Sequence, residues 1–266
     1  MEIQLEGKSF VTFSNWMKAI KCIAEEITLV LDPKGMKVLT MDPSHVAMVD
    51  AKIASKVFGD YSIEGEKETC AFNLSEFLKF LDRLDQKQRV TLSLNVERAK
   101  LILNGKLRGR TRRFELPILN EDEEEVPQPK INFTSEVKMT LDSVSEATMD
   151  VNLVSQHVVI KLTEELVSIT GQGDMGDAFG EWEKDSDDVL SLKVEEEALA
   201  TFTLSYILDM VKALKGTAEE VVDISMTTDM PIKLEAHGDR VEVSVDQPEE
   251  QNTWDLVYYL APCIGA

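Results

Sequence analysis

The sequence contains few of the residues that build catalytic, metal or disulfide sites. Its 266 residues include three cysteines and three histidines: Cys22, Cys70, Cys263, His45, His157 and His237. The cysteines are odd in number and far apart, which argues against a disulfide framework and against a zinc site. The histidines are equally scattered, so their spacing supports no Ser/His/Asp or His/carboxylate group. We therefore expect buried thiols, no metal ion, no cofactor and no hydrolase-type centre.

Long apolar runs and basic side chains are also scarce. No run approaches the roughly 18 residues that span a bilayer, and the start, MEIQLEGKSF, lacks the basic and apolar segments of a signal peptide. We expect an intracellular protein without a membrane partner. With 28 Lys and Arg against 49 Asp and Glu, the formal net charge is -21, which repels phosphate backbones at long range. Contact with DNA would therefore require a local basic surface or a geometry that holds the protein in place.

The rest of the composition is that of a soluble globular protein in which one unit occurs twice. Hydrophobic residues make up 43% of the chain, enough for a full core. Residues 69–105 and 199–238 both contain a Phe-x-Leu-Ser helix start, then an apolar helix and two β-rich runs that end in glycine. A further helix precedes each copy, and SVSE, from Ser143 to Glu146, matches a capping box that predicts a helix start. We expect a duplicated α+β unit.

An acidic segment with three prolines separates the two halves. Residues 117–131, PILNEDEEEVPQPKI, carry five consecutive carboxylates at positions 121–125. Such a run cannot bury itself, so it predicts an extended, solvated connector. The predicted organisation is an N-terminal domain at residues 1–117, a connector at 118–130 and a C-terminal domain at 131–266.

One glycine-rich motif suggests a nucleotide-dependent enzyme as an alternative. GQGDMG, from Gly171 to Gly176, matches G-x-G-x-x-G and follows a strand-like run. A nucleotide-binding loop requires a helix next, whose N-terminus would bind the pyrophosphate. The following DAFGEWEKD shows no helical pattern, and Asp174 and Asp177 would repel a phosphate. We favour a turn between two strands.

Two motifs more than 200 residues apart, LTMDPSHVAMVD at 39–50 and YYLAPCI at 258–264, resemble the proliferating cell nuclear antigen (PCNA) family. These are the sliding clamps of archaea and eukaryotes, and MDPS followed by VAMVD is closer to archaeal members. The resemblance covers the whole chain, including the duplication and the acidic connector. It implies duplicated clamp domains, with helices lining the hole of a ring and β-sheets outside.

The resemblance also implies a function without catalysis. A trimeric ring would encircle duplex DNA and tether polymerase, flap endonuclease and ligase through their PIP-box peptides, once an ATP-driven clamp loader has opened it. A checkpoint-type relative of the clamp, with the same fold and another loader, stays an alternative. A homotrimer and a heterotrimer of related chains both remain open. The expected location is cytoplasmic and nucleoid-associated in an archaeon, and nuclear in a eukaryote.

The polar faces of the predicted helices offer basic side chains to DNA: Lys18, Lys21, Lys79, Arg83, Lys212 and Lys215. They would meet phosphates without reading bases, so binding should be independent of sequence and sensitive to salt. The third helix departs from the family's pattern, because it contains Asp142, Glu146 and Asp150 and no Lys or Arg. Retention on DNA should then depend on topology more than on affinity.

The resemblance further implies an apolar pocket under the connector for the partner peptide. Such a pocket suits a peptide anchored by aromatic residues. Carried over by motif, its walls are Met41, Ser44, His45, Val46, Val126, Pro231, Tyr259, Ala261, Pro262 and Ile264.

The stretch GKLRGRTRR, residues 105–113, puts five basic side chains into nine residues. Alternation along one strand would place four of them on one face: Lys106, Arg108, Arg110 and Arg112. The fifth, Arg113, breaks this register. Alone, the stretch suggests nucleic acid. The resemblance instead puts it at the subunit edge, where the strand DAFGEWEK of the next chain would present Asp177, Glu181 and Glu183. We favour this subunit contact, a head-to-tail contact that closes into a ring.

Overall fold

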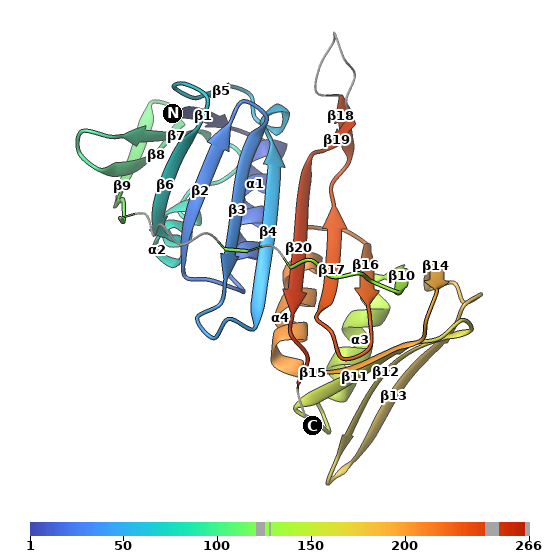
Figure 1. Cartoon of the computed structure of the whole chain (residues 1–266). Helices are drawn as coiled ribbons and strands as arrows, with labels where there is room; N and C mark the ends of the chain where they lie inside the picture. The colour runs from blue at the N-terminus through green and yellow to red at the C-terminus, as the bar shows by residue number, and fades with distance from the viewer. Residues whose placement is uncertain (121–125, 128, 243–249, 264–266) are drawn as a thin grey trace. The chain divides into compact units, whose positions relative to one another are not determined.

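The computed structural model describes residues 1–120, 126–127, 129–242 and 250–263 (Figure 1). The chain divides into two compact units. The first comprises Met1–Pro43, Val49–Val126 and His237–Leu256, and the second comprises Ser44–Met48, Pro127–Ala236 and Val257–Ala266. Each unit thus takes in a short segment from the other half of the chain. The predicted boundaries near residues 117 and 131 stay a prediction.

The first unit places two helices against antiparallel strands. One sheet has the order β5 (Tyr61–Ser62), β1 (Glu2–Leu5), β7 (Arg89–Asn95), β8 (Lys100–Leu107) and β9 (Arg110–Pro117). A second group has the order β4 (Ala47–Ala54), β3 (Gly35–Met41), β2 (Glu26–Asp32) and β6 (Glu68–Asn73). The remaining elements are α1 (Lys8–Ile20), α2 (Leu74–Leu81), the short 3-10 helix η1 (Ser55–Val57) and the hairpin of β18 (Arg240–Glu242) and β19 (Glu250–Asn252).

The second unit repeats this plan. One sheet has the order β13 (Gly176–Glu183), β12 (Leu166–Gly173), β11 (His157–Leu162) and β15 (Ala198–Thr203). A second group has the order β14 (Val189–Val194), β10 (Ser135–Thr140), β16 (Val221–Met226), β17 (Ile232–His237) and β20 (Trp254–Leu260). Its helices are α3 (Leu141–Val151) and α4 (Leu204–Lys215). The predicted duplicated α+β fold is confirmed by this repeated order of elements.

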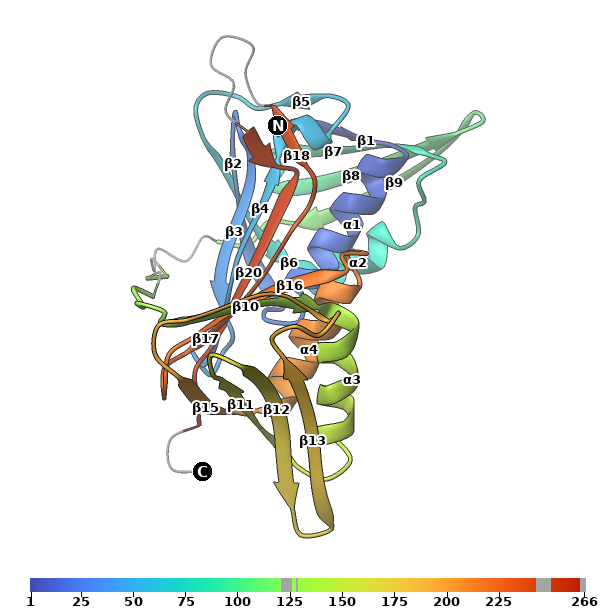
Figure 2. The same cartoon turned by 90° about the vertical axis from the view of Figure 1, so that its right-hand side faces the viewer.

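In each unit the two helices lie side by side on one face of the strands (Figures 1 and 2). The core between them is apolar. In the first unit, Phe13 of α1 meets Phe77 of α2 edge to face, with ring centroids 6.3 Å apart, a favoured aromatic geometry. In the second, α4 buries Leu204, Ile207, Met210, Val211 and Leu214. This burial leaves the opposite face of each helix for polar side chains.

The helix starts follow the sequence patterns in two of three cases. The Phe-x-Leu-Ser pattern correctly predicted α2 and α4, which begin at Leu74 and Leu204. The capping box predicted for α3 is wrong, because the helix begins at Leu141. Ser143 lies inside the first turn, and its hydroxyl donates back to the Thr140 carbonyl at 3.0 Å. Leu141 is buried, and its place in the core extends the helix upstream.

The motif GQGDMG forms a turn between strands, as predicted. Strand β12 ends at Gly173 and β13 begins at Gly176, and these two glycines pair across the hairpin. A Cβ added at Gly173 would lie 1.8 Å from the carbonyl oxygen of Val154, just after α3. The glycine therefore allows the hairpin to approach the end of α3. Within the described residues, no helix is long and apolar enough to cross a membrane, and no group of three acidic, histidine or cysteine side chains could hold a metal ion.

Candidate DNA, partner and subunit surfaces

All six basic residues predicted to face DNA lie on helices or directly after them. Five are exposed and Lys21 is half-buried. These side chains are exposed because the opposite face of each helix is buried. On α1, for example, Phe13 and Met17 pack in the core and Lys18 lies on the solvent side. Lys18 is on α1, Lys79 on α2, and Lys212 and Lys215 on α4, while Lys21 and Arg83 follow α1 and α2. Their contact with DNA stays a prediction.

Four of these six cations already have a carboxylate partner within their own unit. The pairs are Lys18–Asp82 at 2.7 Å, Lys21–Glu25 at 3.3 Å, Lys79–Glu76 at 2.6 Å and Lys215–Asp142 at 2.7 Å. Sequence reasoning missed these partners. Glu76 lies three residues before Lys79 on α2, a spacing that predicts contact on a helix, whereas Glu25 lies four residues after Lys21, beyond the end of α1. Asp82 and Asp142 lie far from their lysines in the sequence, so no local pattern identifies them.

The exposed face of α3 is acidic, as the sequence indicated. Asp142, Glu146 and Asp150 are all exposed, and the helix contains no Lys or Arg. Only the first of them has a basic partner on α4. The neighbouring helix α4 exposes Lys212 and Lys215 together with Asp209, so the basic side chains of the second unit's helices are all on α4.

The basic stretch 105–113 is a hairpin, so the prediction that four cations share one face is wrong. Arg108 and Gly109 form its two-residue turn, with φ of 46° and 80°, the geometry of a tight hairpin turn. The turn interrupts the alternation. Gly105 pairs with Arg112 and Lys106 with Thr111, and paired residues share a face. Lys106 therefore lies on the face opposite Arg112.

The two faces of β9 have different neighbours. On the helix side, Arg112 donates to the backbone oxygen of Arg83, and the ring of Phe114 stacks on Phe80 of α2 with centroids 5.1 Å apart. Arg110 shares this side by alternation. On the other side, Arg113 Nε donates to Glu115 Oε1 at 2.8 Å. Strand β9 is the last strand of its sheet, so its outer edge has no partner strand within the described chain.

Strand β13 is also an edge strand, and its carboxylates share one face. A Cβ added at Gly180 would lie 3.0 Å from Ala147 of α3, so Gly180 points to the helix side. The alternating residues therefore lie on the side away from α3: Asp177, Phe179, Glu181 and Glu183. Phe179 is 65% exposed, a large apolar surface for an edge strand.

Several residues predicted for the partner pocket lie together in the second unit. The amide of Ala261 donates to the carbonyl of Val46 at 2.8 Å, and the amide of Cys263 donates to Thr201 at 2.8 Å. These bonds fix the segment after β20 beside residues 44–48 and β15. Val46 is exposed, Tyr259, Ala261, Pro262 and Pro231 are half-buried, and Ser44 and His45 are exposed.

For the other residues predicted for the pocket, a place beside this group stays a prediction. Met41 and Val126 belong to the first unit. Ile264 and the carboxylates at 121–125 lie outside the described residues. Sequence reasoning missed two exposed apolar side chains nearby, Leu199 and Met230. A backbone hydrogen bond from the Asp229 amide to the Leu199 carbonyl joins their two segments.

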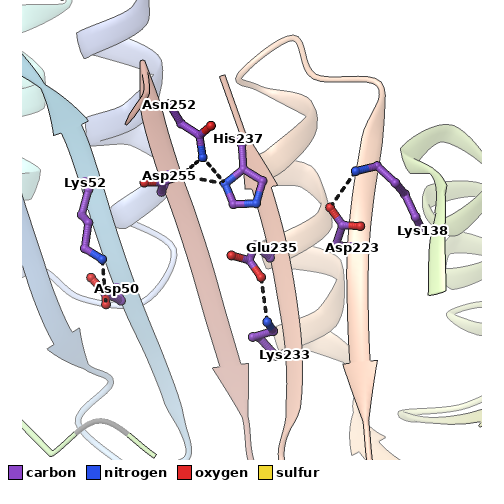
Figure 3. Close-up of polar contacts among 9 residues, drawn as sticks. All are labelled: Asp50, Lys52, Lys138, Asp223, Lys233, Glu235, His237, Asn252 and Asp255. Carbon is purple, nitrogen blue, oxygen red and sulfur yellow. Dashed lines mark hydrogen bonds and ion pairs between the residues drawn. The ribbon is translucent and has the colours of Figure 1, made fainter. Parts of the chain in front are cut away.

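Ion pairs cover the strand faces that point away from the helices (Figure 3). In the second unit, Lys138 pairs with Asp223 at 3.0 Å and Lys233 with Glu235 at 2.7 Å. At the ends of β17, β19 and β20, Asp255 accepts from His237 at 2.7 Å and from Asn252 at 2.6 Å. Burial opposes ionisation of Asp255, but the bonds from His237 and Asn252 outweigh it and hold the pKa of this carboxyl below its usual value.

Replacing Asp255 with Asn is expected to destabilise the protein by about 1 kcal/mol near neutral pH. A depressed pKa stabilises the fold above the unfolded pKa of about 4, and this contribution is lost as the pH falls through the folded pKa. The gap between wild type and Asp255→Asn should therefore narrow below about pH 4. Urea unfolding across this pH range measures the difference in the free energy of unfolding between wild type and Asp255→Asn. The difference between wild type and Asn252→Ala should be smaller. A gap that widens on acidification would contradict this assignment.

Comparisons with known proteins agree with the fold and the repeat. Residues 1–125 match the sequence model of the N-terminal domain of proliferating cell nuclear antigen, and residues 128–243 match that of its C-terminal domain. A protein named DNA polymerase sliding clamp from Methanococcus vannielii is 29% identical over 255 residues, which covers 95% of each chain. One of the same name from Cenarchaeum symbiosum is 28% identical over 250 residues, 94% of each chain.

Solved structures show the same fold. PCNA from Thermococcus kodakaraensis has a TM-score of 0.83 at 20% identity, covering 98% of this chain and 99% of its own. A PCNA2–PCNA3 complex from Sulfolobus tokodaii has a TM-score of 0.79 at 19% identity, covering 98% and 99%. Because two domain models match most of the sequence and the element order is repeated, the chain belongs to the proliferating cell nuclear antigen family.

Proposed function

We propose that this chain, a DNA polymerase sliding clamp, closes into a ring of three subunits that encircles duplex DNA and tethers other proteins to it. The observation that carries the proposal is the match of both clamp domain models along one chain. A ring needs a head-to-tail contact between two different surfaces, and the edge strands β9 and β13 offer one. The clamp would act by holding enzymes on DNA at the site of replication inside the cell, without catalysis of its own.

The charges at the two edges favour a homotrimer. Strand β9 carries Arg110, Arg112 and Arg113, whereas β13 carries Asp177, Glu181 and Glu183. Opposite charges on one chain make its two ends complementary to each other, and they set partner choice and association rate more than affinity. A heterotrimer of related chains is the alternative. Light scattering tests the assembly: three times 29.9 kDa, about 90 kDa, is expected, and a mass of one chain at micromolar concentration would contradict it.

The faces of the edge strands indicate which charges meet. Suppose that β9 of one chain pairs with β13 of the next, and that the helices packed on both strands lie on the same side. Arg113 and Lys106 then approach the carboxylates of β13. Arg110 and Arg112, on the helix side, instead approach α3 of the next chain. There Glu146 and Asp150 are exposed and have no basic partner within the described part of their own chain. This pairing gives the acidic third helix a role in assembly.

DNA contact is proposed for the polar helix faces, through Lys18, Lys21, Lys79, Arg83, Lys212 and Lys215. Carboxylate partners neutralise part of the charge of Lys18, Lys21, Lys79 and Lys215 and so weaken their contacts with phosphates. Binding should be independent of sequence and fall steeply with salt. Retention then rests on the closed ring, which a clamp loader must open.

Partner proteins are proposed to bind by PIP-box peptides at the apolar surface around Val46, Pro231, Tyr259, Ala261 and Pro262. Exposed Leu199 and Met230 extend this surface. Backbone bonds hold the segments together, so the surface exists before the peptide arrives. A preformed apolar surface with few polar groups suits a helical or extended peptide with aromatic anchors.

The change Val46→Glu is expected to weaken binding of a PIP-box peptide about tenfold or more, because a charge would enter the apolar contact. Fluorescence anisotropy with a labelled peptide measures it. The matched control is Leu190→Glu, a similar change at an exposed residue of β14. Equal affinities for the two variants would remove Val46 from the peptide surface.

A further inference from the structure

The exposed helix faces carry ion pairs that connect neighbouring helices. In the first unit, Lys18 at the end of α1 pairs with Asp82, the residue directly after α2, at 2.7 Å. In the second unit, Lys215 at the end of α4 pairs with Asp142 in the first turn of α3, also at 2.7 Å. Both units therefore neutralise a helix-face lysine with a carboxylate from the adjacent helix.

A third pair lies within one helix. Lys79 and Glu76 of α2 are three residues apart, and their charged atoms are 2.6 Å from each other. With Lys21 and Glu25, whose charged atoms are 3.3 Å apart, these pairs put a carboxylate within hydrogen-bonding distance of four of the six cations that the proposed function assigns to DNA. A carboxylate at that distance takes one of the three donor positions of the ammonium group and neutralises part of the charge that would attract a phosphate.

Fold stability gives a reason for Glu76 and Asp142, which stand in the first turns of α2 and α3, where the helix dipole favours an anion, but a weak reason for Asp82. The side chains of all three pairs are well exposed to solvent, and exposed ion pairs add little to stability. Asp82 in addition stands at the C-terminal end of α2, where the helix dipole disfavours an anion. Its position next to Lys18 needs another explanation.

We infer that Asp82, Glu76 and Asp142 compete with DNA phosphates for the lysines of the helix faces and so keep the affinity of the clamp for DNA low. This inference rests on the proposed function. A phosphate that reaches one of these lysines either displaces the carboxylate or meets an ammonium group whose charge the carboxylate partly neutralises, and both lower the gain from the new contact. Weak contacts suit a ring that has to move along DNA while its topology keeps it in place.

The test is a variant with Asp82→Asn, Glu76→Gln and Asp142→Asn, measured for binding to a short linear duplex at several salt concentrations. Each freed lysine that contacts a phosphate should steepen the slope of log affinity against log salt by about 0.9. Three such contacts add about 2.7, equal to a further loss of about 40-fold in affinity between roughly 50 and 200 mM salt. At low salt the variant should bind more tightly than wild type.

A matched control separates this effect from the change in net charge. The control variant carries Asp223→Asn, Glu235→Gln and Glu165→Gln, which also free three lysines, paired at 3.0, 2.7 and 2.6 Å. None of these carboxylates lies on a helix. We expect its salt slope to equal that of wild type. Equal slopes for the two triple variants would overturn the inference.

A single variant and a diffusion measurement test the same inference independently of the triple variant's salt slope. If the helix variant unfolds or loses its assembly, Asp82→Asn alone should still steepen the slope by about 0.9, and an unchanged slope overturns the inference. The loaded helix variant should also diffuse more slowly along DNA than the loaded control. Retention on closed circular DNA does not depend on these carboxylates, so loss of retention in wild type would reject the sliding function itself.

Discussion

Reversing two charges on β9, with Arg110→Glu and Arg112→Glu, is expected to turn the proposed trimer into monomers at concentrations where wild type is assembled. Both side chains lie on the helix side of an edge strand, and Arg112 is held there by its bond to the Arg83 carbonyl. Glutamates at these positions would meet the acidic face of α3 in the next chain. Like charges at an interface cost several kcal/mol, so the assembly constant should fall roughly 100-fold or more.

A rescue experiment identifies the partner of these arginines. Adding Glu146→Arg and Asp150→Arg to the reversed chain should restore the trimer, because the charges become complementary again. Adding Glu181→Arg and Glu183→Arg should not, since those side chains lie on the other face of β13. Light scattering reads each mass. A trimer that persists in the reversed chain, or rescue by the β13 changes alone, would contradict the facial assignment.

A control for overall charge is available on the same domain. Lys67 and Arg98 are exposed and lie outside the edge strand. Changing both to Glu alters the net charge by the same amount as the reversal on β9. The trimer should remain, because neither side chain is near the proposed contact.

The change Gly173→Ala is expected to destabilise the second unit by about 3 kcal/mol. The new Cβ would lie 1.8 Å from the Val154 carbonyl oxygen, and a backbone atom cannot move aside as a flexible side chain can. The hairpin would have to withdraw from the end of α3. Thermal or urea unfolding measures the loss.

The control for this glycine is Gly59→Ala, where a Cβ would meet nothing within 4 Å. We expect a change within about 0.5 kcal/mol of wild type. A stable Gly173→Ala protein would show that the hairpin does not need this close approach.

The sequence was sufficient to predict the repeat, the fold class and the position of two helices. Local patterns carried these predictions: Phe72 and Phe202 stand before Leu-Ser at equivalent points, and the apolar periodicity of α2 and α4 is strong. The start of α3 was misplaced because the capping-box pattern at Ser143 competed with the burial of Leu141. Burial is a property of the tertiary structure, which a pattern of four residues does not contain.

The candidate surfaces were predicted less completely. The hairpin at residues 105–113 was missed although Gly109 is a turn residue, because the run of cations was treated as one alternating strand. Pairs such as Lys18–Asp82 and Lys215–Asp142 join distant parts of the sequence, so only the fold brings them together. The basic face that seemed free for DNA is therefore partly neutralised.

Whether the chain forms a closed sliding ring is measured by following the protein after it has been loaded onto a closed circular duplex. We expect the protein to stay on the circle at salt concentrations that abolish simple binding, because retention is topological. Cutting the circle at one site should then release it within the time needed to slide to an end. Equal retention on the closed and the linearised DNA would contradict the claim that this chain forms a closed sliding ring.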